Sequence, residues 1–202
     1  MISAEDQARL EGAIRDVEDQ TAGEIVVVVA RQASSYSSIP ILWALLGALA
    51  VPWPMIAITT LGPSRIFLVQ LAVALLLSLF LSWPSRRYAL VPGFIKRAQV
   101  HEAAAREFLG RGLTRTREKT GILIYVALAE HYAEILADTG IADEVDPETW
   151  QDIIAKLTAA IREGRIGDGL VAAVRQAGAI LAAHAPPRHD DMDELPNKVI
   201  LL

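Results

Sequence analysis

The sequence contains no cysteine among its 202 residues, and aromatic residues make up only 6% of it. Without cysteine, disulfides, thiolate zinc sites and a catalytic thiol are all excluded. The net charge of −5 argues against a nucleic-acid-binding protein, which usually presents a basic face, so we expect no nucleic acid among the partners. The first twenty residues are polar and acidic, unlike a cleavable signal peptide, which begins with a basic segment. We therefore expect the first hydrophobic span to act as an uncleaved signal anchor.

Charged residues are also absent from two long stretches, residues 32–64 and 66–85. A bilayer core of ~30 Å needs roughly 20 helical residues, and each stretch is long enough. We predict a two-helix transmembrane hairpin over residues 38–85, with a tight turn at Gly62-Pro63. The prolines at 52 and 54 remove backbone donors, so they should break or kink the first helix. The alternative is a pair of buried core helices in a soluble protein, but the rest of the chain is too small to cover both.

Basic residues flank this predicted hairpin on one side. Arg31 precedes it, whereas the turn between its helices contains only Arg65. The positive-inside rule then places both termini and the rest of the chain in the cytoplasm, with the hairpin in the cytoplasmic membrane. We expect the lipid bilayer and other membrane proteins as partners. The basic residues that follow the second span, close to lipid headgroups, are Arg86, Arg87, Lys96 and Arg97.

The remaining sequence alternates between helical and strand patterns. Residues 24–30, in which Glu24 is followed by a continuous apolar run, and residues 121–128 are typical of strands buried on both faces. Residues 132–138 follow a turn too short for a crossover, which predicts an antiparallel partner strand. We expect helices over residues 3–20, 96–112 and 167–184, and another that begins at Asp146-Pro147 with Asp as its N-cap.

The predicted fold class is α/β: a small mixed sheet of three or four strands with helices on its faces, interrupted by the transmembrane hairpin. We expect residues 1–37 and 86–185 to form the two parts of the α/β domain. Residues 186–202 are expected to be an extended tail, in which 198–202 can pair as a strand.

Three segments outside the hairpin resemble the TPM domain, a family of thylakoid lumenal and bacterial membrane-associated proteins. They are TAGEIVVVV at residues 21–29, TREKTGILIYVALAEHYAEILADTGI at 116–141, and Trp150 with the downstream helices and the tail ELPNKVILL at 194–202. The resemblance implies a TPM-like α/β/α fold. The sequence departs from the family pattern in carrying its membrane segment inside the domain, and in having His131 where relatives often have arginine.

The resemblance implies two kinds of function. Some members have acid-phosphatase activity or bind divalent cations, and others assist the assembly or repair of membrane complexes. The sequence contains no Walker loop, GxSxG elbow or HExxH motif, so the catalytic residues are unknown and enzymatic activity is left open. The leading hypothesis is an interaction or assembly module, and the alternative is a metal-dependent phosphatase that uses Ca²⁺ or Mg²⁺.

Carboxylates at strand ends are the candidates for such a metal. Glu24, Asp138 and Asp143 are the predicted ligands, because acidic residues at strand ends can converge on one edge of the sheet. The other acidic or imidazole candidates, and a cluster in the tail, are Glu130, His131, Glu144, Asp146 and residues 189–194. The competing interpretation makes Glu24 a strand-edge charge, Asp146 a helix cap and the others solvated loop or tail residues.

Overall fold

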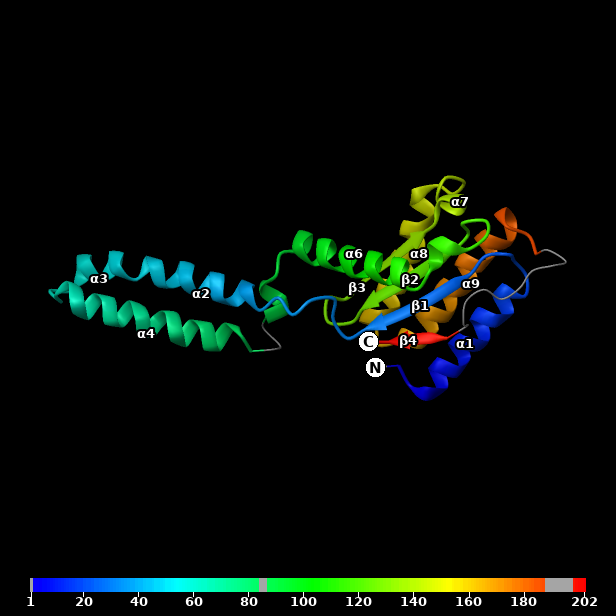
Figure 1. The fold of residues 1–202 in the computed structure, drawn as a ribbon. Helices are drawn as coiled ribbons and strands as arrows, with labels where there is room; N and C mark the ends of the chain where they lie inside the picture. The colour runs from blue at the N-terminus through cyan, green and yellow to red at the C-terminus, as the bar shows by residue number, and fades with distance from the viewer. Residues whose placement is uncertain (1, 84–86, 188–197) are drawn as a thin grey trace. The chain divides into compact units, whose positions relative to one another are not determined.

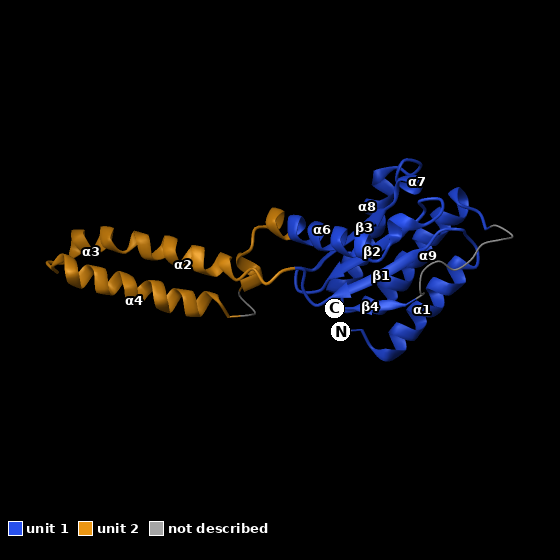
Figure 2. Ribbon diagram, viewed as in Figure 1, with its two compact units in different colours: residues 1–33, 97–202 blue, residues 34–96 orange. Residues whose placement is uncertain are grey.

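The computed structural model describes residues 2–83, 87–187 and 198–202. It divides into two compact units, coloured separately in Figure 2. We call residues 1–33 and 97–202 the α/β unit, and residues 34–96 the hairpin unit. The segment expected to cross the membrane, residues 38–85, lies inside the hairpin unit.

A four-stranded mixed sheet forms the centre of the α/β unit. Its strands are β1 (Ile25–Ala30), β2 (Ile122–Ala127), β3 (Tyr132–Ala137) and β4 (Val199–Leu201), in the order β3-β2-β1-β4. β1 pairs in parallel with both β2 and β4, whereas β3 is antiparallel to β2. The expected mixed sheet, and the pairing of two strands separated by the inserted segment, are confirmed.

Helices cover both faces of this sheet (Figure 1). Alternate residues of β1 point to opposite faces, and all six are buried. Ile25, Val27 and Val29 pack with α1 (Ala4–Glu18), α8 (Pro147–Arg162) and α9 (Ile166–His184). Val26, Val28 and Ala30 pack on the other face with α6 (Gly93–Gly110). Burial of apolar residues on both faces explains why the strand sequence is continuously apolar.

Local signals set the ends of these helices. Ser3 caps α1 by accepting a hydrogen bond from the Asp6 amide at 3.0 Å, and Asp146 caps α8 through the Glu148 amide at 3.0 Å. The cap at Asp146 was expected from the sequence. The structure adds a four-residue helix, α7 (Thr139–Ala142), directly after β3, which the sequence patterns did not predict.

The hairpin unit contains α2 (Ser38–Ala50), α3 (Pro52–Ile58) and α4 (Pro63–Leu81). α2 ends at Ala50, and after Val51 a new helix begins at Pro52, as the missing proline donor predicts. Gly62 is the N-cap of α4, so the turn lies where it was expected. Two 3-10 helices follow along the chain, η1 (Tyr88–Leu90) in this unit and η2 (Leu113–Arg115) in the α/β unit.

Candidate functional site

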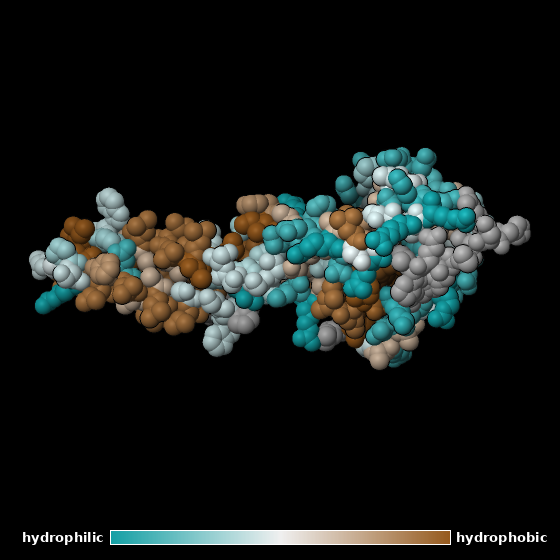
Figure 3. Space-filling model, in the orientation of Figure 1, coloured by the Kyte–Doolittle hydropathy of each residue, from teal (hydrophilic) through white to brown (hydrophobic). Residues whose placement is uncertain are grey.

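The hairpin unit exposes an unusual amount of apolar surface, visible as the brown region over α2, α3 and α4 in Figure 3. Only Ile66 of the nineteen residues of α4 is buried. Soluble proteins rarely leave contiguous apolar patches of this kind uncovered, so this surface is suited to lipid or to another apolar surface. Its large exposed side chains include Leu42, Leu45, Leu49, Trp53, Ile56, Phe67, Leu68, Leu71, Leu75, Leu76, Leu79 and Phe80.

Small residues allow α2 and α4 to pack closely. Ala44 and Ala48 are the buried residues of α2 beyond its first turn, and a Cβ on Gly47 would meet the Leu77 side chain at 3.0 Å. Close approach of helix backbones through small residues is typical of helix pairs in membranes. The two helices also line a groove of about 380 Å³, which is almost entirely apolar but includes the side chain of Gln70.

An aromatic and basic cluster lies where the hairpin unit begins and ends along the chain. The rings of Tyr36 and Tyr88 meet edge to face with centroids 5.8 Å apart, and the Arg87 guanidinium lies 5.3 Å from the Tyr88 ring centre. Tyr36 is buried and has a positive φ of 47°, an uncommon conformation for a residue with a side chain. This cluster was not predicted, because no local sequence pattern joins two tyrosines so far apart.

The predicted membrane-flanking residues are only partly described. Arg87 takes part in the tyrosine cluster, Lys96 is half-buried, and Arg97 is exposed on α6. Arg86 lies outside the described residues. The structure therefore places Arg87, Lys96 and Arg97, and the position of Arg86 after the second span is known from the sequence.

Two of the three predicted metal ligands lie at the same edge of the sheet. The Glu24 carbonyl accepts a hydrogen bond from the Ile122 amide at 2.8 Å, and the Asp138 amide donates to the Gly121 carbonyl at 2.9 Å. Both acidic side chains are buried. Asp143, at the C-terminal end of α7, is exposed. The structure thus brings Glu24 and Asp138 to the same end of the sheet, with β2 between their strands, but does not gather a three-residue cluster with Asp143.

Asp138 has a clear structural role. Its Oδ1 accepts from the Thr139 amide at 2.7 Å and so caps α7, while its Oδ2 is buried without a hydrogen-bond partner in the described part of the chain. Within residues 2–83, 87–187 and 198–202, no group of three or more His, Cys, Asp and Glu side chains is placed to hold a metal ion. Metal binding by these carboxylates therefore stays a prediction.

The remaining candidates from the sequence have separate positions. Glu130 is buried and accepts a hydrogen bond from the Ala33 amide at 3.0 Å, which ties the chain after β1 to the turn after β2. His131 is exposed in that turn with a positive φ of 53°, and Glu144 is also exposed. The interpretation of Asp138 and Glu130 as solvated loop residues was wrong, because tertiary packing buries both. The tail cluster at residues 189–194 lies outside the described residues.

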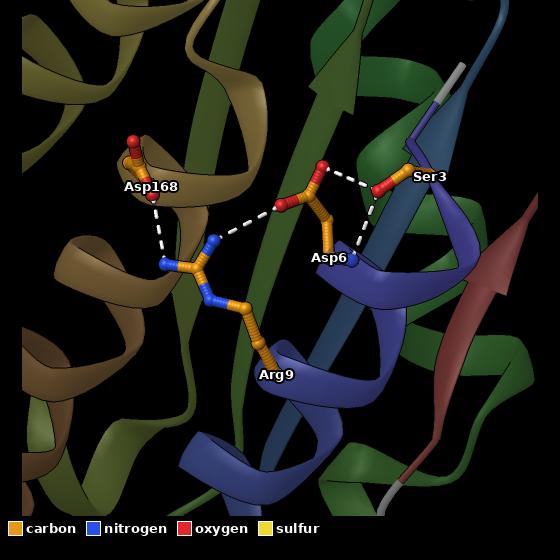
Figure 4. A network of polar contacts seen from close by, with 4 residues as sticks. All are labelled: Ser3, Asp6, Arg9 and Asp168. Carbon is orange, nitrogen blue, oxygen red and sulfur yellow. Dashed lines mark hydrogen bonds and ion pairs between the residues drawn. The ribbon is translucent and has the colours of Figure 1, made fainter.

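A polar network joins the first turns of α1 and α9 (Figure 4). The Arg9 guanidinium donates to Asp168 at 2.8 Å and to Asp6 at 3.1 Å, and the Ser3 hydroxyl donates to Asp6 at 2.7 Å. The hydrogen bond with Asp168 raises the pKa of Arg9. Half of the Arg9 side chain is exposed, so the network is a surface feature that links two helices.

Burial also changes the titration of two tyrosines in the α/β unit. Burial, followed by the nearby charges of Glu130 and Glu107, raises the pKa of Tyr125 to about 12. Burial and then Glu134 raise the pKa of Tyr132. Both hydroxyls therefore stay protonated at physiological pH.

Comparison with known proteins supports the fold. A search of curated proteins found no significant match. The NMR structure of the BA42 protein from the psychrophilic bacterium Bizionia argentinensis is similar, with a TM-score of 0.62 and 22% sequence identity. The match covers 100% of this chain and 95% of that chain, and at this identity it shows the fold alone. In sequence, residues 89–180, which contain α6, β2, β3, α7, α8 and most of α9, match the family model of the TPM domain.

Proposed function

We propose that this protein is an integral membrane protein, in which the hairpin unit anchors a TPM-like α/β unit that acts as an interaction or assembly module for other membrane proteins. The observation that carries the proposal is the exposed apolar surface of α2, α3 and α4. In water this surface would favour aggregation, whereas in a bilayer it is matched by the lipid chains.

The lengths of the helices support this placement. The segment Ser38–Ile58 has 21 residues and α4 has 19, and both are apolar enough to cross a membrane. At about 1.5 Å per residue they extend roughly 31 and 28 Å, close to the ~30 Å of a bilayer core. Two spans return the chain to the side on which it entered, so both parts of the α/β unit share one compartment.

The distribution of basic residues favours the cytoplasm as that compartment. In the sequence, Arg31 precedes the two helices and Arg86, Arg87, Lys96 and Arg97 follow them, whereas at the opposite end of the hairpin the sequence has only Arg65, in the first turn of α4. The paired tyrosines and Arg87 are residue types that favour the membrane–water interface, where aromatic rings and basic groups contact lipid headgroups.

A module that binds proteins is favoured over an enzyme because the buried acidic groups have structural tasks. Asp138 caps α7, and Glu130 holds the chain that follows β1. The second candidate function, a phosphatase dependent on Ca²⁺ or Mg²⁺, is supported by the buried Asp138 Oδ2, which lacks a hydrogen-bond partner in the described residues and lies at the same sheet edge as Glu24. Hard cations bind carboxylate oxygens of this kind.

Single-cysteine labelling tests the proposed topology, because the natural chain contains no cysteine that could interfere. Ser64→Cys places a thiol on the exposed first turn of α4, and Ala142→Cys places one on the exposed surface of the α/β unit. In intact cells, a membrane-impermeant maleimide should label Ser64→Cys but label Ala142→Cys only after lysis. The opposite pattern would reverse the orientation, and recovery of both variants as soluble protein would exclude the membrane anchor.

The two candidate activities are separated by the same set of substitutions. If the protein is an assembly module, Glu24→Ala, Asp138→Ala and Asp143→Ala should each preserve the recovery of partner proteins from membranes, while an unrelated hairpin in place of residues 38–85 should reduce it. Metal-dependent hydrolysis of a phosphomonoester by the purified protein, lowered by orders of magnitude in one of these variants with its fold preserved, would instead favour the phosphatase.

A further inference from the structure

Gln70 is the one amide side chain between Ala33 and Ala98, and it lies within α4. Its position is half-buried and lines the groove between α2 and α4, among Leu42, Leu45 and Leu46 on one side and Phe67 and Leu71 on the other. Within the described residues, the Gln70 side chain makes no hydrogen bond. An amide with two donors and an acceptor is therefore presented by an otherwise apolar groove.

If the hairpin spans a bilayer, Gln70 lies at a depth where an amide without a hydrogen-bonding partner costs free energy. The inference rests on that proposed function. Gln70 is seven residues beyond Pro63, about 10 Å along a helix that extends roughly 28 Å. That position is inside the hydrocarbon region, away from water at either surface. Polar groups there gain free energy when they find a hydrogen-bonding partner on another helix.

We propose that the groove between α2 and α4 is a self-association surface, in which a second copy of this chain packs with its α4 against the groove and the two Gln70 amides hydrogen-bond to each other. An amide side chain both donates and accepts, so two identical amides satisfy one another. Copies of one protein enter the membrane in the same orientation. A two-fold axis along the membrane normal therefore brings the two Gln70 side chains to the same depth without any further adjustment.

The shape of the groove is consistent with a helix as its occupant. Bulky leucines of α2 line one side, Phe67 and Leu71 of α4 line the other, and each helix also contributes a small side chain, Ala48 and Ala74. Side chains from a partner α4 can enter such a groove, as in the packing of helices in membranes. A lipid acyl chain could fill the apolar part of the groove but has no group that pairs with the amide.

The test measures association of the full-length chain in phosphatidylcholine vesicles, by energy transfer between donor-labelled and acceptor-labelled copies at increasing dilution in lipid. Wild type should associate, and Gln70→Leu should weaken association about tenfold, because interhelical hydrogen bonds of this kind contribute on the order of 1–2 kcal/mol. Gln70→Asn, which keeps the amide, should retain most of the association. Leu76→Ala, which truncates an exposed side chain on the face of α4 opposite the groove, should leave it unchanged.

A second variant addresses the groove itself. Ala74→Phe fills the groove without changing Gln70, and should also reduce association. Resistance of each variant to alkaline extraction from membranes is measured in parallel, because it reports anchoring independently of self-association. Anchored protein that is monomeric at every dilution, or that associates equally with Gln70→Leu, would overturn the self-association surface while leaving the membrane anchor intact. Loss of the wild type from the membrane fraction would overturn the proposed function itself.

Discussion

Helices α4 and α9 have the same length and are both apolar enough to cross a membrane, but the rest of the protein buries much more of α9 than of α4. Each has 19 residues. α4 buries only Ile66, whereas eight residues of α9 are buried against the rest of the α/β unit. Length and composition select both helices, as well as Ser38–Ile58, as candidate spans. The distribution of polar residues separates them.

The exposed side of α9 carries charged residues along the helix, whereas that of α4 is almost entirely apolar. Arg175 is exposed in the middle of α9, and Asp168 in its first turn pairs with Arg9 of α1. In α4, the only charged residue is Arg65, in the first turn. A helix with a charged group on its exposed face and an apolar stripe on the other is built for the boundary between a protein core and water. We conclude that α9 is a core helix of the α/β unit and that, among the described residues, the extended apolar surface suited to lipid lies on the hairpin unit.

The largest effect expected within this comparison comes from a charge inside the α/β unit. Val27→Asp places a carboxylate in the centre of β1, at a position with no exposed surface. An unpaired buried charge should destabilise the unit by about 4 kcal/mol or more, measured by urea denaturation in detergent with circular dichroism. Ala155→Asp, on the exposed surface of α8, is the control and should change stability little. Equal stability of the two variants would contradict the position of β1 in the core.

A matched pair of leucine truncations tests the two helices directly. Leu181→Ala in α9 removes a fully buried side chain, so it should cost about 2–5 kcal/mol in unfolding free energy. Leu75→Ala in α4 removes a side chain that is 61% exposed, and it should change stability by less than about 0.5 kcal/mol. Thermal unfolding of both variants in the same detergent provides the measurement. Similar losses would mean that α4 has a packing partner comparable to the core around α9.

Sequence patterns were sufficient for most of the fold, because the deciding signals are local. The break before Pro52, the cap at Asp146 and the buried runs of β1 and β2 each follow from a few neighbouring residues. The helix α7 was missed because four residues are too few for a periodic pattern. The place of β4 beside β1 was also not predicted, since a three-residue strand can pair at any free edge.

The candidate site was harder to predict than the fold, because it depends on contacts between distant segments. Burial of Asp138 and Glu130 arises from neighbours across the sheet and from the chain after β1, so neither could be distinguished from a loop residue by its own sequence. Gln70 did have a sequence signal, as the one amide within a long charge-free region. Its meaning became apparent only when α2 and α4 placed it in a groove.

Alkaline pH should lower the stability of the α/β unit and leave the anchoring by the hairpin unit unchanged. The unfolded chain loses the proton of a tyrosine near pH 10, whereas burial keeps Tyr125 protonated to about 12. Between these values the unfolded state binds fewer protons, so stability of the α/β unit should fall as pH rises, by at most about 1.4 kcal/mol per pH unit. Urea denaturation across this range should show the loss, and Tyr125→Phe should reduce its slope. Membrane anchoring by the hairpin unit should persist, and an unchanged slope in Tyr125→Phe would contradict the assignment.

The smallest effect is expected from the polar network between α1 and α9. Arg9→Gln removes the ion pairs with Asp6 and Asp168 but keeps a polar side chain at a half-exposed position. Exposed ion pairs contribute little and are screened by salt, so the variant should be slightly less stable at low ionic strength and indistinguishable from wild type at high ionic strength.

Arg175→Gln is the matched control for this last prediction, since Arg175 is exposed on α9 and is not part of the network. Thermal unfolding at low and high salt should show a salt-dependent difference from wild type for Arg9→Gln alone. Because the Ser3 cap and the apolar contacts of Leu10 and Ile14 remain, α1 should stay docked in both variants. A loss in Arg9→Gln as large as that in Leu181→Ala, at any salt concentration, would mean that charge pairing, and not apolar burial, holds α9 in the α/β unit.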